Sequence, residues 1–387
     1  MKITKVRPIL ADRFLFVLVE TDAGFTGVGE SGAWGHLPAS ATAIQTFSEY
    51  LVGRDAGEIE QHWNTMHRFG HFRGAAICGA ISAIDIALWD IKGQALGVPI
   101  HALLGGPTRR RARLYAHVKA PTRERVVEIA LQRKAMGFTA IGHLNPFLDE
   151  DRERPYFRSH ARKIDDGVRV VAELRDALGP DVDLCVEIHR RLTPPEAIVF
   201  AHEIAPFRPM FYEDPIRPGS AEAMGRVADA ISLPIATGER FFSLEEFQIH
   251  ISRGALAYAR VSISLCGGIT GARKVAALAE AFDVAIVPHN PLSPISLAAA
   301  LHLDAAIPNF AIQEYPLTGD SAGGDEGAPH LRGWHLVDRA FEVEDGFVAI
   351  PGEAGLGLRL AAGCEQAPVV ARDIRMRSHL DGHVVDQ

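Results

Sequence analysis

The sequence predicts an α/β protein, a barrel of alternating strands and helices preceded by a smaller α+β N-terminal domain. Short apolar segments alternate with amphipathic stretches from residue 121 to residue 340, as strands and helices alternate around a parallel sheet. Residues 1–120 begin instead with apolar and polar residues in alternation, which is typical of an antiparallel sheet. The 387 residues, 47% of them apolar, suffice for a large core and a smaller second domain.

The elements of the N-terminal domain are predicted from the first hundred residues of the chain. Strands are expected at Lys2–Ile9, Leu15–Glu20 and Thr26–Glu30, with a hairpin turn at 22–24. Ala75–Leu96 carries small or apolar residues on nearly every face. This pattern predicts a buried helix packed between two layers.

The barrel elements are predicted from the alternation that follows. Strands are expected at Phe138–Leu144, Val182–Ile188, Met210–Tyr212, Leu233–Thr237, Tyr258–Ile263, Val284–Val287 and Phe310–Gln313. Helices are expected at Arg123–Met136, Ile164–Leu178, Pro194–Ile204, Ala221–Ile231, Leu244–Ser252, Ile269–Phe282 and Ser296–Leu303. An opening strand near Arg113–His117 is needed to complete the barrel. Residues 341–387 have the pattern of short strands and turns, and we expect them to fold back onto the N-terminal domain.

Three glutamates each close a short apolar segment in the middle of the chain. The intervals from Glu187 to Glu213 and from Glu213 to Glu239 both equal 26 residues, which matches one strand, one helix and two short loops. The glutamates therefore occupy equivalent C-terminal strand ends, where barrel active sites lie. Three converging carboxylates suit a hard divalent cation, most simply Mg²⁺. The alternative is three exposed strand-end glutamates.

Composition disfavours several partners. The formal net charge of −8 is spread along the chain, so nothing indicates nucleic acid. The sequence lacks both an apolar signal segment at its start and a long apolar run, and we expect no membrane partner and a cytoplasmic location. The four cysteines have no CxxC spacing and are expected to be buried thiols.

A series of motifs then gives the chain a specific resemblance. SAIDIALWDIKGQALGVPIHALLGG, VEIHRRLTPPEA, YEDP, ATGER, GGIT, VPHNPLSP and PNFAIQEYP follow one another from residue 82 to about residue 316. With them the chain resembles the enolase superfamily, in its mandelate racemase-like group, and most of all the acid-sugar dehydratases acting on mannonate, galactonate or gluconate. The resemblance implies a (β/α)7β modified TIM barrel covered by an α+β N-terminal capping domain. It implies one Mg²⁺ on Glu187, Glu213 and Glu239, and a homo-oligomer. It also implies dehydration of a six-carbon aldonate or aldarate to a 2-keto-3-deoxy acid through an enediolate.

The resemblance assigns catalytic roles to three more residues. His189 lies two residues after Glu187, and in a continuous strand both side chains would point to the same side. The resembling dehydratases use this histidine to protonate the departing 3-hydroxyl. His289 corresponds to the catalytic histidine of the racemase-like group. Glu314 would bond the substrate carboxylate or the enediolate oxygen, and should be protonated or paired with Arg260.

The base that removes the α-proton stays open. The aspartate expected to orient His289 is Ser262 in this chain, so the histidine lacks a partner that would raise its basicity. The second barrel strand carries His143 and Asn145 where lysines are expected. The loop after it contains Tyr156, and the mannonate-type enzymes draw a Tyr/Arg base from that loop. His289, His143 and Tyr156 are all candidates.

Substrate contacts are expected from both domains. Trp34, His36, His71 and Arg73 lie in glycine-containing loops that would close over the distal hydroxyls, although Trp34 and Arg73 could equally be packing residues. The barrel residues expected to contact substrate are His143, Asn145 and Arg260. An ion pair that only stabilises the barrel is the alternative for Arg260.

Three other functions compete with dehydration. A racemase or epimerase of the same superfamily would use two bases. A glycosidase needs two facing carboxylates roughly 5 to 10 Å apart and no metal, which three ligands on adjacent strands fit poorly. A catalytically silent barrel with a binding role is the third.

Overall fold

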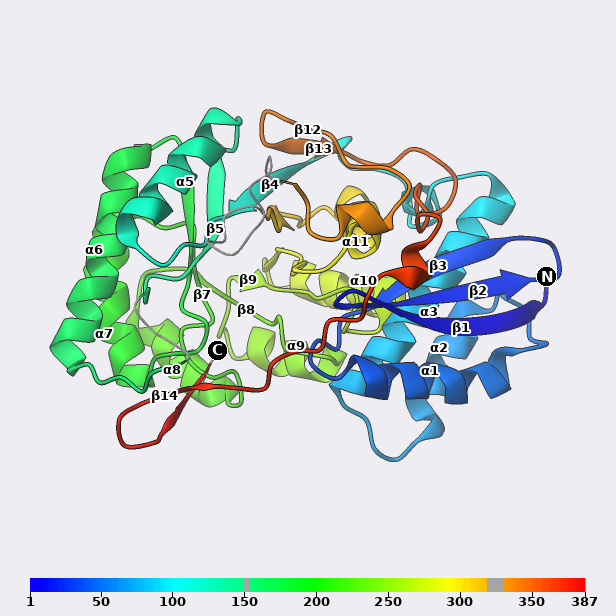
Figure 1. The fold of residues 1–387 in the computed structure, drawn as a ribbon, viewed down its shortest axis with the longest axis horizontal. Helices are drawn as coiled ribbons and strands as arrows, with labels where there is room; N and C mark the ends of the chain where they lie inside the picture. The colour runs from blue at the N-terminus through cyan, green and yellow to red at the C-terminus, as the bar shows by residue number, and fades with distance from the viewer. Residues whose placement is uncertain (149–152, 319–329, 387) are drawn as a thin grey trace.

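The computed structural model describes residues 1–148, 153–318 and 330–386, with the capping domain beside the barrel (Figure 1). The cap opens with an antiparallel sheet of β1 (Ile3–Ala11), β2 (Phe14–Thr21) and β3 (Thr26–Ser31), paired in chain order. Four helices follow: α1 (Leu37–Leu51), α2 (Ile59–Phe69), α3 (Ala75–Leu96) and α4 (Ile100–Leu103). Most of α3 is buried between β3 and the barrel helix α10 (Gly268–Glu280), as its apolar pattern predicts.

The barrel is closed by eight parallel strands among the described residues. These are β4 (Arg111–His117), β5 (Ala140–Leu144), β6 (Asp183–Glu187), β7 (Phe211–Glu213), β8 (Ile235–Thr237), β9 (Tyr258–Ala259), β10 (Ala285–Ile286) and β11 (Gln313–Tyr315). Strands β4 to β10 pair in chain order and β11 pairs with β4. A bridge between Ile286 and Phe310 completes the ring. The predicted (β/α)7β fold is confirmed.

Seven helices connect these strands in the described part of the chain. They are α5 (Arg123–Ala135), α6 (His160–Leu178), α7 (Pro194–Ile204), α8 (Ala221–Ala230), α9 (Leu244–Ser252), α10 (Gly268–Glu280) and α11 (Pro294–Ala306). A short 3-10 helix, η1 (Ala205–Phe207), follows α7. Inside the ring, Tyr115, Phe211, Val287 and Ile312 fill the barrel. Because the centre is packed, chemistry is confined to the C-terminal strand ends.

The last barrel strand begins later in the structure than the sequence predicts. The last strand was expected at Phe310–Gln313, but the ladder with β4 starts only at Gln313. The backbone before it bonds the opposite neighbour, since Ala311 N donates to the carbonyl of Ile286. The opening strand expected near Arg113–His117 is present as β4, which pairs with β5 in the barrel sheet.

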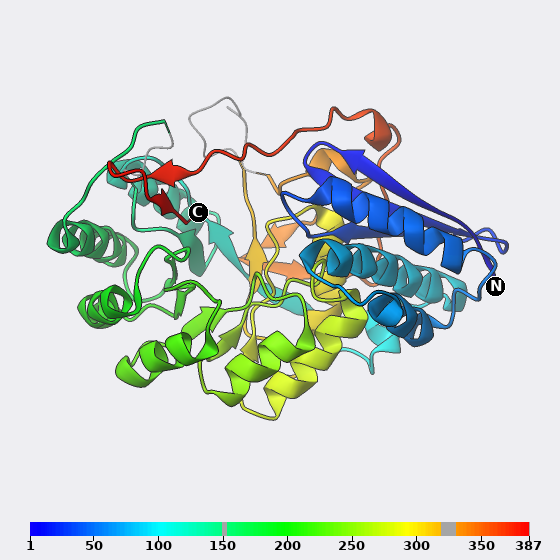
Figure 2. The same cartoon turned by 90° about the horizontal axis from the view of Figure 1, so that it is seen from below.

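The C-terminal segment contacts both domains. Strands β12 (Val343–Glu344) and β13 (Phe347–Ala349) extend the sheet beside β4. Two 3-10 helices, η2 (Trp334–Leu336) and η3 (Cys364–Gln366), lie before and after that hairpin, and Glu365 forms an ion pair with Arg7 of the cap at 2.6 Å. The tail then crosses to the barrel and ends in a hairpin of β14 (Arg377–Ser378) and β15 (Val384–Val385) (Figure 2).

Buried hydrogen bonds connect the cap to the barrel helices α10 and α11. Asp85 of α3 accepts the backbone N–H of Thr270 at 3.0 Å. Glu30 of β3 accepts the hydroxyl of Ser293 and the N–H of Ser296 at the start of α11. Burial raises the pKa of Glu30 to about 7. These contacts hold the cap against the barrel face that carries α10 and α11.

The buried thiols expected from the cysteine spacing are present. All four cysteines are free and buried. In the part of the chain that the structure describes, no helix combines the length and the apolar character that crossing a bilayer needs.

Candidate active site

The three evenly spaced glutamates converge at the C-terminal ends of neighbouring strands. Glu187 is the last residue of β6 and lies in register with Glu213, the last residue of β7. Glu239 follows β8 by two residues. One carboxylate oxygen from each lies within 4.8 Å of the others. The 26-residue period therefore corresponds to one β/α unit, as its length predicts.

Glycine is required where the chain turns toward Glu239. Gly238 has φ +131°, a conformation that side chains disfavour. A Cβ there would also lie 2.7 Å from the ring of Phe247 and 3.1 Å from the backbone oxygen of Arg260. The ATGER segment thus uses its glycine to bring the third glutamate in beside the other two.

The cluster concentrates negative charge in a buried place. Burial first, and then the neighbouring carboxylates, raise the pKa of Glu187 well above its ordinary value. Burial also raises the pKa of Glu213, to about 8, although Arg260 opposes the shift. Burial acts in the same direction on Glu239, but Arg190 and then His289 outweigh it and lower its pKa. A cation bound between these carboxylates would oppose the upward pKa shifts of Glu187 and Glu213.

A buried arginine supports the third glutamate and was not expected from the sequence. Nη1 of Arg190 lies 3.0 Å from Asp214 and also pairs with Glu239. Asp214 accepts in addition the hydroxyl of Thr237 at 2.5 Å. The available signal was the position of Arg190 and Asp214 directly beyond two predicted strand ends, in IHRR and YEDP.

Arg260 joins the glutamate cluster to Glu314. Its Nε pairs with Glu213 and its Nη2 lies 2.7 Å from Glu314, the partner expected from the sequence. Glu314 also accepts the N–H of Asn290 at 2.7 Å and the Nε2 of His117 at 2.7 Å. Although burial opposes ionisation, Arg260 and then His289 and His117 hold the pKa of Glu314 well below its ordinary value.

His189 lies in the cluster, but not for the reason that strand periodicity gives. Strand β6 ends at Glu187, and His189 has φ +55°. The turn is fixed by the N–H of His189, which donates to Glu187 at 2.6 Å. The ring lies edge-on to His143 at 5.8 Å, and its Nε2 is 3.1 Å from the guanidinium of Arg190. Burial, and then Arg190, lower its pKa well below the ordinary value.

His289 contacts Glu239, the third glutamate of the cluster. Its Nε2 lies 3.4 Å from Glu239, so this glutamate supplies a carboxylate neighbour that Ser262 cannot. Its Nδ1 is buried with no hydrogen-bond partner among the described residues. Burial lowers the pKa of His289.

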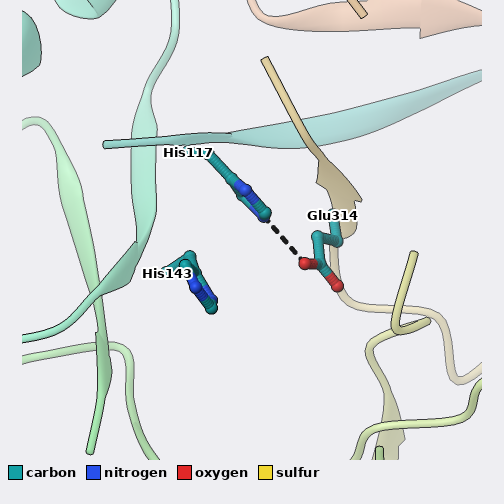
Figure 3. A group of neighbouring side chains, drawn as sticks. All are labelled: His117, His143 and Glu314. Carbon is teal, nitrogen blue, oxygen red and sulfur yellow. Dashed lines mark hydrogen bonds and ion pairs between the residues drawn. The ribbon is translucent and has the colours of Figure 1, made fainter. Parts of the chain in front are cut away.

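Strained backbone is concentrated at these strand ends. His143, His189, Arg190 and Asp214 all have positive φ, between 38° and 68°. Such values are uncommon for residues other than glycine and occur often at functional sites. Figure 3 shows His143 beside His117, with the two rings stacked at 4.8 Å, and His117 reaching Glu314.

The other predicted site residues have contacts of a different kind. Tyr156 packs against His379 at 5.1 Å and its backbone bonds Ser378 and Leu380 of the C-terminal hairpin. Oδ1 of Asn145 accepts the N–H of Phe147 within its own turn. From the cap, Trp34 stacks under Arg372 at 4.5 Å, Arg73 contacts His67 at 3.0 Å, and the exposed His36 and His71 lie in the flanking loops. Their roles stay predictions.

The residues present fit a hard divalent cation. Oε2 of Glu187 and Oε2 of Glu213 are buried and have no hydrogen-bond partner within the described residues. Such orphaned acceptors are costly unless a further group satisfies them. Around them, the carboxylates of Glu187, Glu213, Glu239 and Asp214 lie beside the guanidinium groups of Arg190 and Arg260. An oxygen-lined, negatively charged site of this kind suits Mg²⁺.

Comparison with known protein families shows which family the chain belongs to. Residues 4–105 match the family described as mandelate racemase / muconate lactonizing enzyme, N-terminal domain. Residues 125–363 match the family described as enolase C-terminal domain-like. The chain belongs to the enolase superfamily. The resemblance inferred from the motifs is confirmed.

Curated relatives are similar to this chain over nearly its whole length. It is 38% identical to a D-galactonate dehydratase of Xanthomonas oryzae pv. oryzae over 363 residues, covering 93% of this chain and 92% of that protein. It is 37% identical to a D-galactonate dehydratase of Ralstonia pickettii, covering 96% and 94%. The expectation of a hydro-lyase of this superfamily is confirmed at this level.

A solved structure is similar over its full length. An enolase of Agrobacterium radiobacter, provisionally assigned as a galactarate dehydratase and containing sodium and L-malate, has a TM-score of 0.91 and 27% identity, with all of both chains covered. The cap and the barrel of this superfamily member therefore follow an arrangement already seen in crystals.

Proposed function

We propose that the protein is a Mg²⁺-dependent dehydratase that converts a six-carbon sugar acid into a 2-keto-3-deoxy acid. The observation that carries the proposal is the convergence of Glu187, Glu213 and Glu239, two of which have a buried oxygen with no hydrogen-bond partner among the described residues. Similarity to D-galactonate dehydratases supports the reaction class and makes galactonate the first substrate to test. The two flanking arginines keep the glutamates in place without filling their free oxygens.

The three glutamates are proposed to hold the cation. Bound there, Mg²⁺ would neutralise charge that develops on the substrate carboxylate when the α-proton leaves. Arg190 fixes the orientation of Glu239, and Arg260 fixes that of Glu213. Partners of this kind commonly change metal affinity when they are removed.

His189 is proposed to protonate the departing 3-hydroxyl. Its ring contacts the guanidinium of Arg190 and lies edge-on to His143, and its backbone N–H bonds Glu187 of the glutamate cluster. The metal-free site lowers its pKa, and an anionic substrate would oppose that shift by favouring the imidazolium. General acid catalysis by a positioned histidine contributes roughly 10²- to 10⁴-fold.

His289 is proposed to take the α-proton. Its Nε2 lies 3.4 Å from Glu239, and this carboxylate favours the protonated imidazole. His143 is the rival on the β5 side. Tyr156 is the third candidate, and its described contacts are with the C-terminal hairpin.

Substrate recognition is proposed to come from the cap and from the loop after β5. Trp34, His36 and Arg73 lie on exposed cap loops, and Asn145 lies where β5 gives way to its loop. Arg260 is only 1% exposed and its donors already bond Glu213, Glu314 and backbone carbonyls. We therefore assign Arg260 an indirect role. A homo-oligomer and a cytoplasmic location complete the proposal.

A screen of aldonic and aldaric acids tests the proposal. In the presence of Mg²⁺ at least one acid should yield a 2-keto-3-deoxy product, detected by a carbonyl-specific colour reaction and by NMR. EDTA should abolish the signal and excess Mg²⁺ should restore it. If no acid yields a keto product while some are epimerised, the reaction is racemisation or epimerisation and the proposal fails.

A further inference from the structure

A buried row of hydrogen bonds runs from β4 to the metal ligands. It passes from His117 to Glu314, from Glu314 to Arg260, and from Arg260 to Glu213. We propose that His117 is a positioning residue that holds Glu213 in its ligating orientation through Glu314 and Arg260. This inference rests on the proposed function for its kinetic readout, whereas its metal-binding readout is independent of any substrate.

The first contact in the row fixes both partners. Nε2 of His117 lies 2.7 Å from Oε1 of Glu314, and the two residues are 6% and 1% exposed. The other oxygen of Glu314 accepts Nη2 of Arg260 and the N–H of Asn290, each at 2.7 Å. With three donors on its two oxygens, Glu314 is an ionised acceptor, and Nε2 of His117 must carry the hydrogen.

The next contact transmits the position of Glu314. Arg260 uses two nitrogens of one planar guanidinium, Nη2 and Nε, to bond Glu314 and Glu213. Its Nη1 is held by the carbonyls of Val287 and Pro288, both at 3.1 Å. The guanidinium is rigid and planar, and all three of its nitrogens are bonded. A shift of the group toward one carboxylate therefore changes its hydrogen-bond geometry at the other.

Removal of the His117 donor would therefore disturb the metal ligand. A buried Glu314 oxygen would be left without a hydrogen bond, which is costly for a charged group. The carboxylate would compensate by drawing Arg260 toward itself, and the guanidinium would lose its geometry at Glu213. Loss of an outer partner of a metal site typically weakens metal binding by roughly 10- to 100-fold.

The same side chains do not resemble a second metal site. His117, His143 and Glu314 offer ligand atoms within 4.8 Å of one another. However, the two imidazole rings are stacked with an interplanar angle of 18° instead of converging on one point (Figure 3). Both oxygens of Glu314 already accept hydrogen bonds, and the cation Arg260 is adjacent. The hydrogen-bonded interpretation accounts for every contact.

Two substitutions of His117 separate its hydrogen bond from its bulk. His117→Gln keeps an N–H donor near the position of Nε2, whereas His117→Phe keeps the ring that stacks on His143 but has no donor. His117→Met, which also lacks the donor, serves if the phenylalanine variant does not fold. His250→Phe is the matched control, because His250 is a buried histidine that bonds only a backbone carbonyl of its own helix, α9, among its described hydrogen bonds.

The measurements are Mg²⁺ affinity by calorimetry without substrate, and kcat and KM with the acid found in the screen. His117→Phe should bind Mg²⁺ roughly tenfold or more weakly and lose kcat, while His117→Gln and His250→Phe stay within about threefold of the wild-type protein. Wild-type Mg²⁺ affinity in a folded His117→Phe variant overturns the inference. Equal weakening in the glutamine and phenylalanine variants also overturns it. If no acid is dehydrated, the proposed function fails while the affinity comparison still decides the role of His117.

Discussion

Replacing Glu213 by glutamine should have opposite effects on the metal-free and the Mg²⁺-bound protein. Glu213 is 1% exposed, and its pKa is raised from 4.5 to about 8, by burial and by the carboxylates around it. The folded state therefore binds more protons than the unfolded state between about pH 4.5 and pH 8, and its stability falls as pH rises through that interval. Glutamine is neutral and isosteric, so Glu213→Gln should remove this pH dependence and one metal ligand together.

The size of the effect follows from the same pKa. The difference between 4.5 and about 8, at about 1.4 kcal/mol per pKa unit, corresponds to an upper limit of about 5 kcal/mol. Arg260 would lose its partner at Glu213 but keep Glu314 and two backbone carbonyls. This loss offsets part of the gain. At about pH 8 without metal, we expect Glu213→Gln to be more stable than the wild-type protein by about 1 to 3 kcal/mol.

Urea unfolding near pH 8, in EDTA and in millimolar Mg²⁺, measures both effects. The wild-type protein should be stabilised by Mg²⁺ because the ion binds only the folded state, and Glu213→Gln should not be. Glu203→Gln is the matched control, since Glu203 is an exposed glutamate of α7 and its change should leave both curves unaltered. A Glu213→Gln protein that is less stable than wild type in EDTA and still stabilised by Mg²⁺ would refute the reasoning.

Three further outcomes are expected. His189→Asn should lower dehydration by roughly 10²-fold or more while α-proton exchange into deuterated water continues, because abstraction precedes loss of the hydroxyl; dehydration at the wild-type rate would contradict the acid role. His289→Asn should stop α-proton exchange and Tyr156→Phe should not, as NMR of recovered substrate would show; the reverse result would make Tyr156 the base. Light scattering at working concentration should find an oligomer, and a strictly monomeric mass would contradict that prediction.

The sequence predicted those parts of the site that depend on chain topology. A β/α unit has a nearly constant length, so equal intervals were enough to bring Glu187, Glu213 and Glu239 together. The pairing of Arg260 with Glu314 could also be anticipated, because a buried carboxylate beside an anion needs a cation. Alternation of strand and helix patterns likewise located the barrel elements.

Other parts of the site depend on contacts that no local pattern records. His117 meets Glu314 across 197 residues of sequence, and Arg190 meets Glu239 across 49. In the sequence, His117 and Arg190 look like ordinary residues near strand ends, and their partners are known only from the closed barrel. His189 shows a different limit, because the strand period was extended past Glu187, where the chain has already turned. Its place in the cluster comes from a positive φ and a bond to Glu187.

Exchange of the substrate α-proton with solvent deuterium tests the central claim most directly. The sugar acid found in the screen, incubated in deuterated water, should lose its α-proton signal only when Mg²⁺ is present. EDTA or Glu213→Gln should abolish the exchange, because Glu187, Glu213 and Glu239 are proposed to hold the ion that makes the proton acidic. Exchange that continues unchanged in EDTA, or in Glu213→Gln, would contradict the account.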